Sequence, residues 1–179
     1  MEHLTSMDLK KEIREIQDYP KKGISFKDIT TLTKNPVAFN YVVNQIVEKF
    51  KTEGITKVVA LEARGFIFGG AIAHGLNAGF VPIRKKGKLP AKRISETYSL
   101  EYGKDRIEMH SDALEQNDVV LIHDDLLATG GTALAALNMV KRFGIKKIVF
   151  SFVCDLDFIE TNAKKEIKDF EMQVLVKYT

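Results

Sequence analysis

The sequence predicts an α/β protein with an open, mostly parallel, twisted sheet flanked by helices. Three short and almost wholly apolar runs carry this prediction, at residues 58–61, 119–122 and 148–153, with a weaker fourth at 80–83. Continuous apolar runs without alternation are typical of strands that are buried on both faces. Helix-like stretches separate these runs, and the alternation of strand and helix favours parallel pairing.

The helix-like stretches are indicated by apolar spacing and by end signals. Residues 7–16 space their apolar side chains like a short amphipathic helix. Residues 35–50 add a proline in the first turn, and residues 67–76 and 132–143 follow two of the apolar runs. Because no repeat or linker divides the chain, residues 1–179 are interpreted as one domain.

The composition indicates a globular protein and excludes several other classes. The net charge of +3 is too weak to indicate a nucleic-acid partner without a clustered patch. We expect no secretory signal and no membrane partner, because no apolar run approaches the length of a membrane span. Cys154 is interpreted as a small buried hydrophobe, since a single thiol forms no internal disulfide. The expected location is the cytoplasm.

Ligands of open α/β sheets bind beyond the carboxyl ends of the strands, so the segment after residues 119–122 is the first candidate site. Its glycines and threonines precede a helix, where free N–H groups bind anions. Acids beside a phosphate would repel it unless they accept hydrogen bonds from sugar hydroxyls or hold a divalent cation. A 5-phosphorylated ribose is the simplest ligand with both features. The candidate residues are Asp124, Asp125, Ala128, Thr129, Gly130, Gly131 and Thr132.

Two further segments place cations on the same face of the predicted sheet. Arg64 follows the run at 58–61 and can bind phosphate oxygens with its planar guanidinium. Residues 84–93 hold six cations in ten residues, which predicts a mobile loop that attracts anions. A solvated charged face is the commoner meaning of such a run, and no aromatic residue is interleaved for stacking on nucleic acid.

Together these motifs resemble those of the type I phosphoribosyltransferases, which bind 5-phosphoribosyl-1-pyrophosphate and Mg²⁺. The run D-D-L-L-A-T-G-G-T at 124–132 is similar to the adenine-specific branch, because enzymes for 6-oxopurines commonly carry an acid at the Ala128 position. E-A-R-G-F at 62–66 resembles the pyrophosphate loop of that branch, and residues 84–103 resemble its flexible catalytic loop. The resemblance implies adenine and phosphoribosyl pyrophosphate as substrates, with AMP and pyrophosphate as products.

The resemblance also implies roles for individual residues. Asp124 and Asp125 would bind the ribose hydroxyls, and the backbone of residues 128–132 would hold the 5-phosphate. A small N-terminal hood within residues 1–34 would cover the base. The expected pyrophosphate-loop and catalytic-loop residues are Ala63, Arg64, Arg84, Lys88 and Tyr102, the expected catalytic residues are Arg64 and Glu101, and the expected adenine-binding residues are Ser25, Phe26 and Lys27.

The resemblance further implies Mg²⁺ held mainly through pyrophosphate and the ribose hydroxyls, with no direct protein ligand. It implies a homodimer in which Arg84 acts across the interface, and a non-proline cis peptide between Ala63 and Arg64. The chain departs from the family pattern at two places. His123 stands where an apolar residue is usual, and we assign it no role. After Asp155 the chain lacks the Gly-Arg that ends the family pattern L-x-x-L-x-G-R.

Three alternatives stay open at this point. A related transferase for xanthine, hypoxanthine or guanine would keep the fold, although Ala128 disfavours the latter two bases. A regulator could keep the phosphoribosyl site as a sensor and bind DNA or RNA, but no helix-turn-helix pattern is evident and Arg64 and Glu101 are in place. A scaffold α/β protein would have to carry four ordered motifs by accident.

Overall fold

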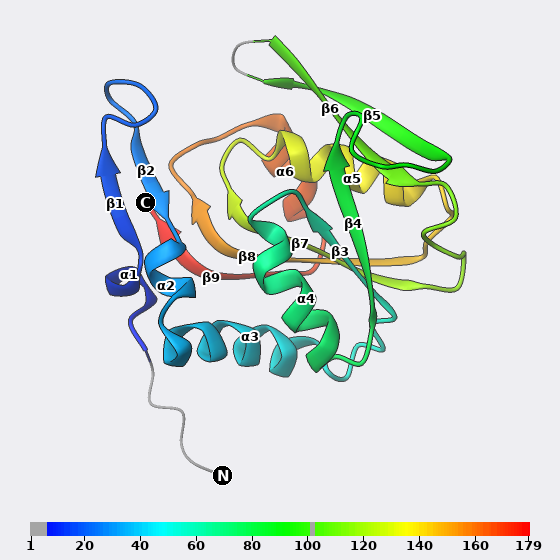
Figure 1. Cartoon of the computed structure of the whole chain (residues 1–179), viewed down its shortest axis with the longest axis horizontal. Helices are drawn as coiled ribbons and strands as arrows, with labels where there is room; N and C mark the ends of the chain where they lie inside the picture. The colour runs from blue at the N-terminus through cyan, green and yellow to red at the C-terminus, as the bar shows by residue number, and fades with distance from the viewer. Residues whose placement is uncertain (1–6, 101–102) are drawn as a thin grey trace.

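A computed structural model describes residues 7–100 and 103–179. Its main sheet has seven strands in the order β5-β6-β4-β3-β7-β8-β9 (Figure 1). The pairs that β3, β4, β7, β8 and β9 form with one another are parallel, and only β6 pairs antiparallel, with β4 and β5. The strands are β3 (Lys57–Leu61), β4 (Gly79–Lys85), β5 (Arg93–Leu100), β6 (Gly103–His110), β7 (Val119–Leu127), β8 (Lys147–Leu156) and β9 (Met172–Tyr178). The predicted open, mostly parallel sheet is confirmed.

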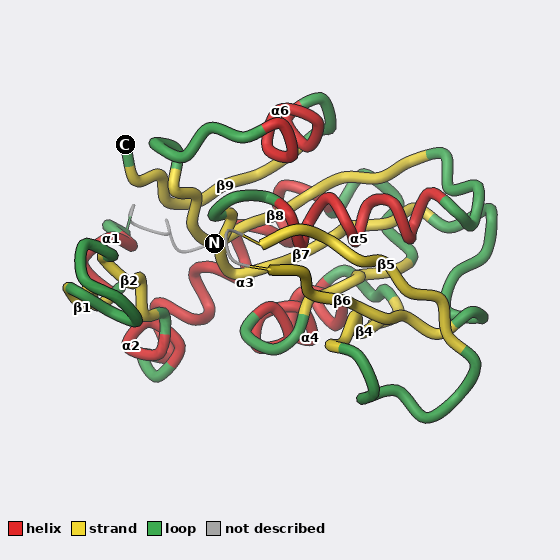
Figure 2. The backbone as a smooth tube through the Cα atoms, turned by 90° about the horizontal axis from the view of Figure 1, so that it is seen from above, coloured by secondary structure: helices red, strands yellow, loops and turns green. Residues whose placement is uncertain are grey.

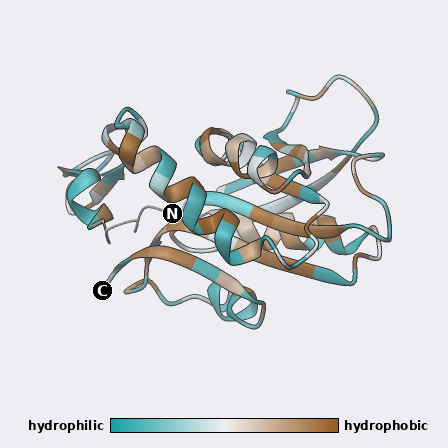
Figure 3. Cartoon of the chain, turned by 90° about the horizontal axis from the view of Figure 1, so that it is seen from below, coloured by the Kyte–Doolittle hydropathy of each residue, from teal (hydrophilic) through white to brown (hydrophobic). Residues whose placement is uncertain are grey.

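Helices cover both faces of this sheet. Figure 2 shows α5 (Gly131–Lys141) and α6 (Asn162–Lys168) on one face, with α3 (Pro36–Phe50) and α4 (Gly65–Gly75) on the other. Each face has its own hydrophobic core, because the central strands are buried on both sides. In Figure 3 the hydrophobic colour gathers along the strands of the sheet. Among the described residues, no helix is long and apolar enough to cross a membrane.

The N-terminal segment forms a separate small layer at one end of the sheet. It contains α1 (Leu9–Glu12), β1 (Arg14–Gln17), β2 (Ser25–Asp28) and α2 (Thr30–Thr33), and β1 pairs antiparallel with β2. The prediction of one helix over residues 7–16 was therefore wrong beyond α1. The sequence R-E-I-Q has a single apolar residue and shows no clear period, so the pairing with β2 decides its structure.

The remaining predicted elements are present with small shifts of their ends. Asn35 accepts hydrogen bonds from the first N–H groups of α3 and so begins the helix that its sequence predicted. Strand β7 is longer than its apolar run and includes Asp124 and Asp125. Residues 93–100 form β5 and pair with β6, so much of the segment predicted as a flexible loop at 84–103 is a hairpin arm.

Candidate active site

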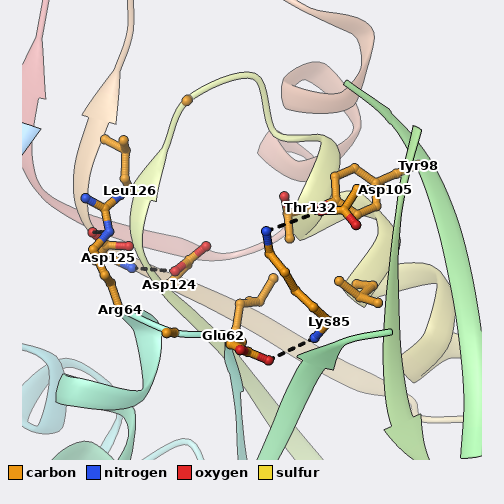
Figure 4. A pocket seen from close by; sticks show the side chains of 13 residues that line it. Glu62, Arg64, Lys85, Tyr98, Asp105, Asp124, Asp125, Leu126 and Thr132 are labelled. Carbon is orange, nitrogen blue, oxygen red and sulfur yellow. Dashed lines mark hydrogen bonds and ion pairs between the residues drawn. The ribbon is translucent and has the colours of Figure 1, made fainter. Parts of the chain in front are cut away.

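A cavity of about 330 Å³ lies beyond the carboxyl ends of β3 and β7 and beneath the β5–β6 hairpin (Figure 4). Its position is the one that the topology of parallel sheets favours for ligands. It gathers acids and cations from four separate segments of the chain. The lining residues are Leu61, Glu62, Ala63, Arg64, Lys85, Tyr98, Asp105, Ile107, Asp124, Asp125, Leu126, Ala128 and Thr132.

Asp124 and Asp125 are consecutive in β7 and therefore leave the strand on opposite sides. Figure 4 shows the Asp124 carboxylate directed into the cavity and the Asp125 carboxylate directed toward Arg64. Burial, followed by the neighbouring charge of Asp125, raises the pKa of Asp124 well above its usual range. Burial also raises the pKa of Asp125, although the Arg64 cation opposes this. Two buried acids side by side favour a ligand that donates hydrogen bonds or carries positive charge.

Arg64 links this acid pair to the N-terminal hood. Its Nε lies 3.0 Å from Asp125 Oδ2, and its guanidinium lies 5.1 Å from the centre of the Phe26 ring. Tyr19 packs edge-on against Phe26 with ring centres 5.2 Å apart. The structure therefore brings the residue predicted to stack on the base next to the residue predicted to bind pyrophosphate, although 38 positions separate them.

The phosphate-binding segment leads directly from β7 into α5. Gly130 precedes α5 with φ +80°, a conformation that L side chains rarely adopt. The helix begins at Gly131, and Thr132 in its first turn, where the backbone N–H groups have no partner within the helix, lines the cavity. Gly65, at the start of α4, is also sterically required, because a Cβ there would lie 2.9 Å from Asp124 Oδ1.

Glu62 gathers the cations of the basic segment, a role that the sequence did not reveal. Its carboxylate accepts from Lys88 Nζ at 2.5 Å, from Arg84 Nε at 3.3 Å and from the backbone N–H of Lys85 at 2.9 Å. Burial raises the pKa of Glu62, but these three hydrogen bonds outweigh burial and hold the pKa below its usual value. Glu62 is therefore a carboxylate that fixes two of the predicted pyrophosphate-binding side chains.

The cis peptide of this loop lies one residue earlier than expected. It joins Glu62 to Ala63, so the expectation of a cis bond between Ala63 and Arg64 was wrong. A second cis peptide, Tyr19–Pro20, precedes a proline in the hood. The family resemblance indicated which loop holds the cis peptide but not which of its peptide bonds is cis.

The hairpin contributes polar residues that sequence reasoning did not single out as site residues. The Tyr98 hydroxyl lies 3.3 Å from Asp105 Oδ2, and Lys85 Nζ lies 3.5 Å from the same oxygen. Burial raises the pKa of Tyr98, which keeps the phenol protonated at neutral pH. The tyrosine belongs to the Y-S-L-E-Y-G motif, so that motif was the available signal. Glu101 and Tyr102 of the same motif lie outside the described residues.

The hood residues next to Phe26 turn their side chains to partners outside the cavity. Lys27 is buried, with its Nζ 2.8 Å from Glu15 Oε2 and 3.1 Å from Ser25 Oγ. The same ammonium lies 4.2 Å from the centre of the Tyr178 ring in the last strand. These contacts fasten β2 to the sheet, and they leave the expected contact with a base to the backbone of Ser25 and Lys27.

His123 and Cys154 are both core residues. His123 is fully buried with Nδ1 2.8 Å from Ser151 Oγ, and burial lowers its pKa to about 3. Cys154 is also fully buried, and burial raises the pKa of its thiol to about 12. A neutral imidazole and a protonated thiol inside the sheet indicate that both side chains pack in the core and take no part in catalysis.

Comparison with known proteins identifies the class to which this fold and cavity belong. Residues 28–177 match the phosphoribosyl transferase domain family. The adenine phosphoribosyltransferase of Brachyspira hyodysenteriae is 51% identical over 172 residues, which cover 96% of this chain and 100% of that protein. The chain therefore belongs to the adenine phosphoribosyltransferase family.

Solved structures agree with this assignment. The crystal structure of the Rhodothermus marinus adenine phosphoribosyltransferase has a TM-score of 0.87 and 45% identity, over 95% of this chain and 96% of that chain. The Giardia lamblia enzyme, complexed with 9-deazaadenine, has a TM-score of 0.89 and 36% identity, over 96% of this chain and 97% of that chain. The resemblance and the fold that the sequence predicted are confirmed.

Proposed function

We propose that this chain transfers the 5-phosphoribosyl group from phosphoribosyl pyrophosphate to N9 of adenine, giving AMP and pyrophosphate. The observation that carries the proposal is the single cavity region in which Asp124 and Asp125, the N-terminus of α5 and Arg64 come together. Acids for sugar hydroxyls, N–H donors for a phosphate and a cation for pyrophosphate match the three parts of that substrate. The relatives named above support adenine as the acceptor.

The protein would act by positioning and electrostatics. When pyrophosphate leaves, positive charge develops at the anomeric carbon, and adenine N9 attacks that carbon. Arg64, Arg84 and Lys88 would stabilise the negative charge that grows on the leaving group. The carboxylates of Asp124 and Asp125 would hold the ribose hydroxyls while Ala128, Thr129, Gly130, Gly131 and Thr132 hold the 5-phosphate. Glu101 would handle the proton near the base, and Tyr102 would close over the site.

The base would bind beneath the hood. Phe26 would stack on adenine, and the backbone of Ser25 and Lys27 would read its edge. For this the Arg64 guanidinium, which now lies over the Phe26 ring, would turn toward pyrophosphate. Ala128 offers no carboxylate at the position where 6-oxopurine enzymes commonly carry one, which favours adenine.

The donor set fits Mg²⁺ bound together with the substrate. Within residues 7–100 and 103–179, no group of three or more His, Cys, Asp or Glu side chains could hold a metal ion by itself. Mg²⁺ commonly keeps several waters and binds substrate phosphates, so we expect it to be held mainly through pyrophosphate and the ribose hydroxyls, beside the Asp124 carboxylate that lines the cavity. When bound, the ion would neutralise charge on pyrophosphate.

We also propose that the whole chain acts as one cytoplasmic domain and forms a homodimer. Two large apolar side chains, Ile67 of α4 and Phe80 of β4, are 41% and 39% exposed and would be covered in such an interface. Arg84 bonds to Glu62 of its own chain in this structure. Its action across the interface would require it to exchange this partner for the pyrophosphate of the other subunit.

Identification of the product tests the proposed function. The full chain is incubated with radiolabelled adenine, phosphoribosyl pyrophosphate and Mg²⁺, and the products are separated by chromatography. Labelled AMP that requires both the phosphoribosyl donor and the metal supports the proposal. Absence of AMP, together with tight binding of phosphoribosyl pyrophosphate, would overturn the proposal in favour of a regulator that senses this metabolite.

A further inference from the structure

Thr161 contacts the phosphate-binding segment from outside the cavity. Its Oγ1 donates to the carbonyl oxygen of Thr129 at 2.6 Å and accepts from the N–H of Lys164 at 3.1 Å, so the hydroxyl also caps α6. Counted from Asp155, Thr161 and Asn162 stand where the family pattern carries Gly-Arg. The hydroxyl is therefore a feature of this chain that the pattern does not supply.

The bond to Thr129 fixes the orientation of one peptide plane. In a trans peptide the carbonyl and the following N–H point in opposite directions, so a Thr129 carbonyl directed at Thr161 turns the Gly130 N–H away from α6. Within the described part of the chain, that N–H has no hydrogen-bond acceptor. A free N–H beside the start of α5 is available to an anion in the phosphate-binding segment.

Gly130 cannot fix this plane by itself. Rotation of the Thr129–Gly130 peptide by a half turn would change the φ of Gly130 from +80° to a negative value, and glycine adopts both about equally well. The rotated peptide would present a carbonyl oxygen to the phosphate, and the two would repel each other. An external hydrogen bond is therefore needed to hold the N–H toward the ligand, and Thr161 provides it.

Helix α6 is rigidly held where this bond requires it. Lys164 Nζ lies 2.5 Å from Asp155 Oδ1 and 2.7 Å from the carbonyl oxygen of Leu156, and both charged side chains are almost completely buried. The helix also packs directly on the segment, because a Cβ on Gly130 would lie 3.0 Å from Lys164 Cγ. Thr161 is thus anchored to β8 through the buried ion pair.

We propose that Thr161 is a positioning residue for the 5-phosphate, which acts by holding the Gly130 N–H toward the ligand. The inference rests on the proposed function, because it assumes a phosphorylated sugar in the cavity. It predicts a loss of affinity for the phosphate half of the substrates and none for the base.

Calorimetric binding of ribose 5-phosphate to the full chain tests the inference. The variant is Thr161→Val/Asn162→Pro, in which proline at the first position of α6 replaces the stabilisation lost with the cap. Thr161 has an extended backbone, which is the conformation that a following proline favours. Thr161→Ser keeps the hydroxyl, and Thr33→Val removes a hydroxyl that bonds the Thr30 carbonyl on remote α2. Thermal unfolding of each variant is recorded to confirm that it is folded at the temperature of the titration.

We expect the double variant to bind ribose 5-phosphate about tenfold more weakly, the scale of one lost hydrogen bond to a charged group. Thr161→Ser and Thr33→Val should bind like the parent, and the KM for adenine should not change in any of them. Equal affinity of parent and double variant would overturn the role of Thr161. If the parent itself does not bind ribose 5-phosphate, the phosphate assignment fails, and the role of Thr161 fails with it.

Discussion

Arg64 Nε lies 3.0 Å from Asp125 Oδ2, so a cation predicted to bind pyrophosphate is paired with an acid predicted to bind ribose. The pairing offsets a buried negative charge, since Asp125 is only 3% exposed. Binding of the substrate would replace each partner, with ribose hydroxyls taking the acid and pyrophosphate oxygens taking the guanidinium. The pair thus keeps both charges beside the cavity in the free protein, and Arg64 would turn from Asp125 and Phe26 toward pyrophosphate only when the substrate binds.

Arg64→Ala should lower turnover at least about a hundredfold, which is typical of a lost donor that stabilises developing charge. The turnover of Arg64→Lys should lie between that of the parent and that of Arg64→Ala, because an ammonium keeps the charge without the planar pair of donors. Steady-state pyrophosphate release measures both variants. Lys51→Ala, which removes an exposed cation beyond α3, serves as the control. Near-normal turnover of Arg64→Ala would remove Arg64 from the site.

Glu62→Gln should lower kcat by about tenfold without raising the KM for phosphoribosyl pyrophosphate. The amide loses the charge-assisted hydrogen bonds that orient Lys88 and Arg84, and each such bond contributes about 1.5–3 kcal/mol. It also removes a negative charge near the expected pyrophosphate position, which favours binding. Initial rates at varied donor concentration separate the two constants. A raised KM with unchanged kcat would show that Glu62 serves binding and not orientation.

Phe26→Ala should raise the KM for adenine and leave the KM for phosphoribosyl pyrophosphate unchanged. Stacking of a base on an aromatic ring contributes about 1–3 kcal/mol, which corresponds to about a fivefold to hundredfold change. Phe158→Ala removes a ring that is 63% exposed and is the matched control. An unchanged KM for adenine in Phe26→Ala would place the base elsewhere in the cavity.

Asp124→Asn should stabilise the free protein while it impairs the reaction. The pKa of Asp124 is raised by burial and by Asp125, so the ionised form is disfavoured in the folded state. Ionisation of Asp124 therefore lowers the stability of the folded parent. This destabilisation is absent below the pKa that Asp124 has in the unfolded chain, and it is complete above the raised pKa that it has in the folded protein. The unfolding free energy of Asp124→Asn should therefore exceed that of the parent by an amount that grows as pH rises above about 4.

Denaturant unfolding at pH 5 and pH 8 measures this difference, and Asp112→Asn on the exposed turn after β6 is the control. Turnover of Asp124→Asn should fall about tenfold to a hundredfold, the scale of a lost hydrogen bond from a ribose hydroxyl to a charged acceptor. A variant that is less stable than the parent at pH 8 would contradict the origin of the raised pKa in burial and repulsion.

The parts of the fold that were predictable are those fixed by local patterns. The apolar runs at 58–61, 119–122 and 148–153 indicated β3, β7 and β8 because burial on both faces leaves almost no polar positions. Strand β5 was not predicted because its few apolar residues are interrupted by polar ones, and its structure depends on pairing with β6. The four residues of β1 include one apolar side chain and show no clear period, so only their pairing with β2 decides their structure.

The same distinction holds for the site. The segment from Asp124 to Thr132 was readable because its ligand groups are consecutive. The role of Glu62 could not be predicted, because its partners Arg84 and Lys88 lie 22 and 26 residues further along the chain. Thr161 is similarly remote from Thr129 and lies 32 positions further along the chain. Such relationships arise from the order of the strands and not from local sequence.

The central claim, adenine-specific phosphoribosyl transfer, is tested most directly by pyrophosphate release with four bases in parallel. The full chain is supplied with phosphoribosyl pyrophosphate and Mg²⁺, and with adenine, hypoxanthine, guanine or xanthine. Release with adenine alone is the expected result, in agreement with a base pocket under Phe26 that has no acid at Ala128. Release with another base in place of adenine would contradict the assignment of that pocket, and release with none of them would contradict the transferase activity itself.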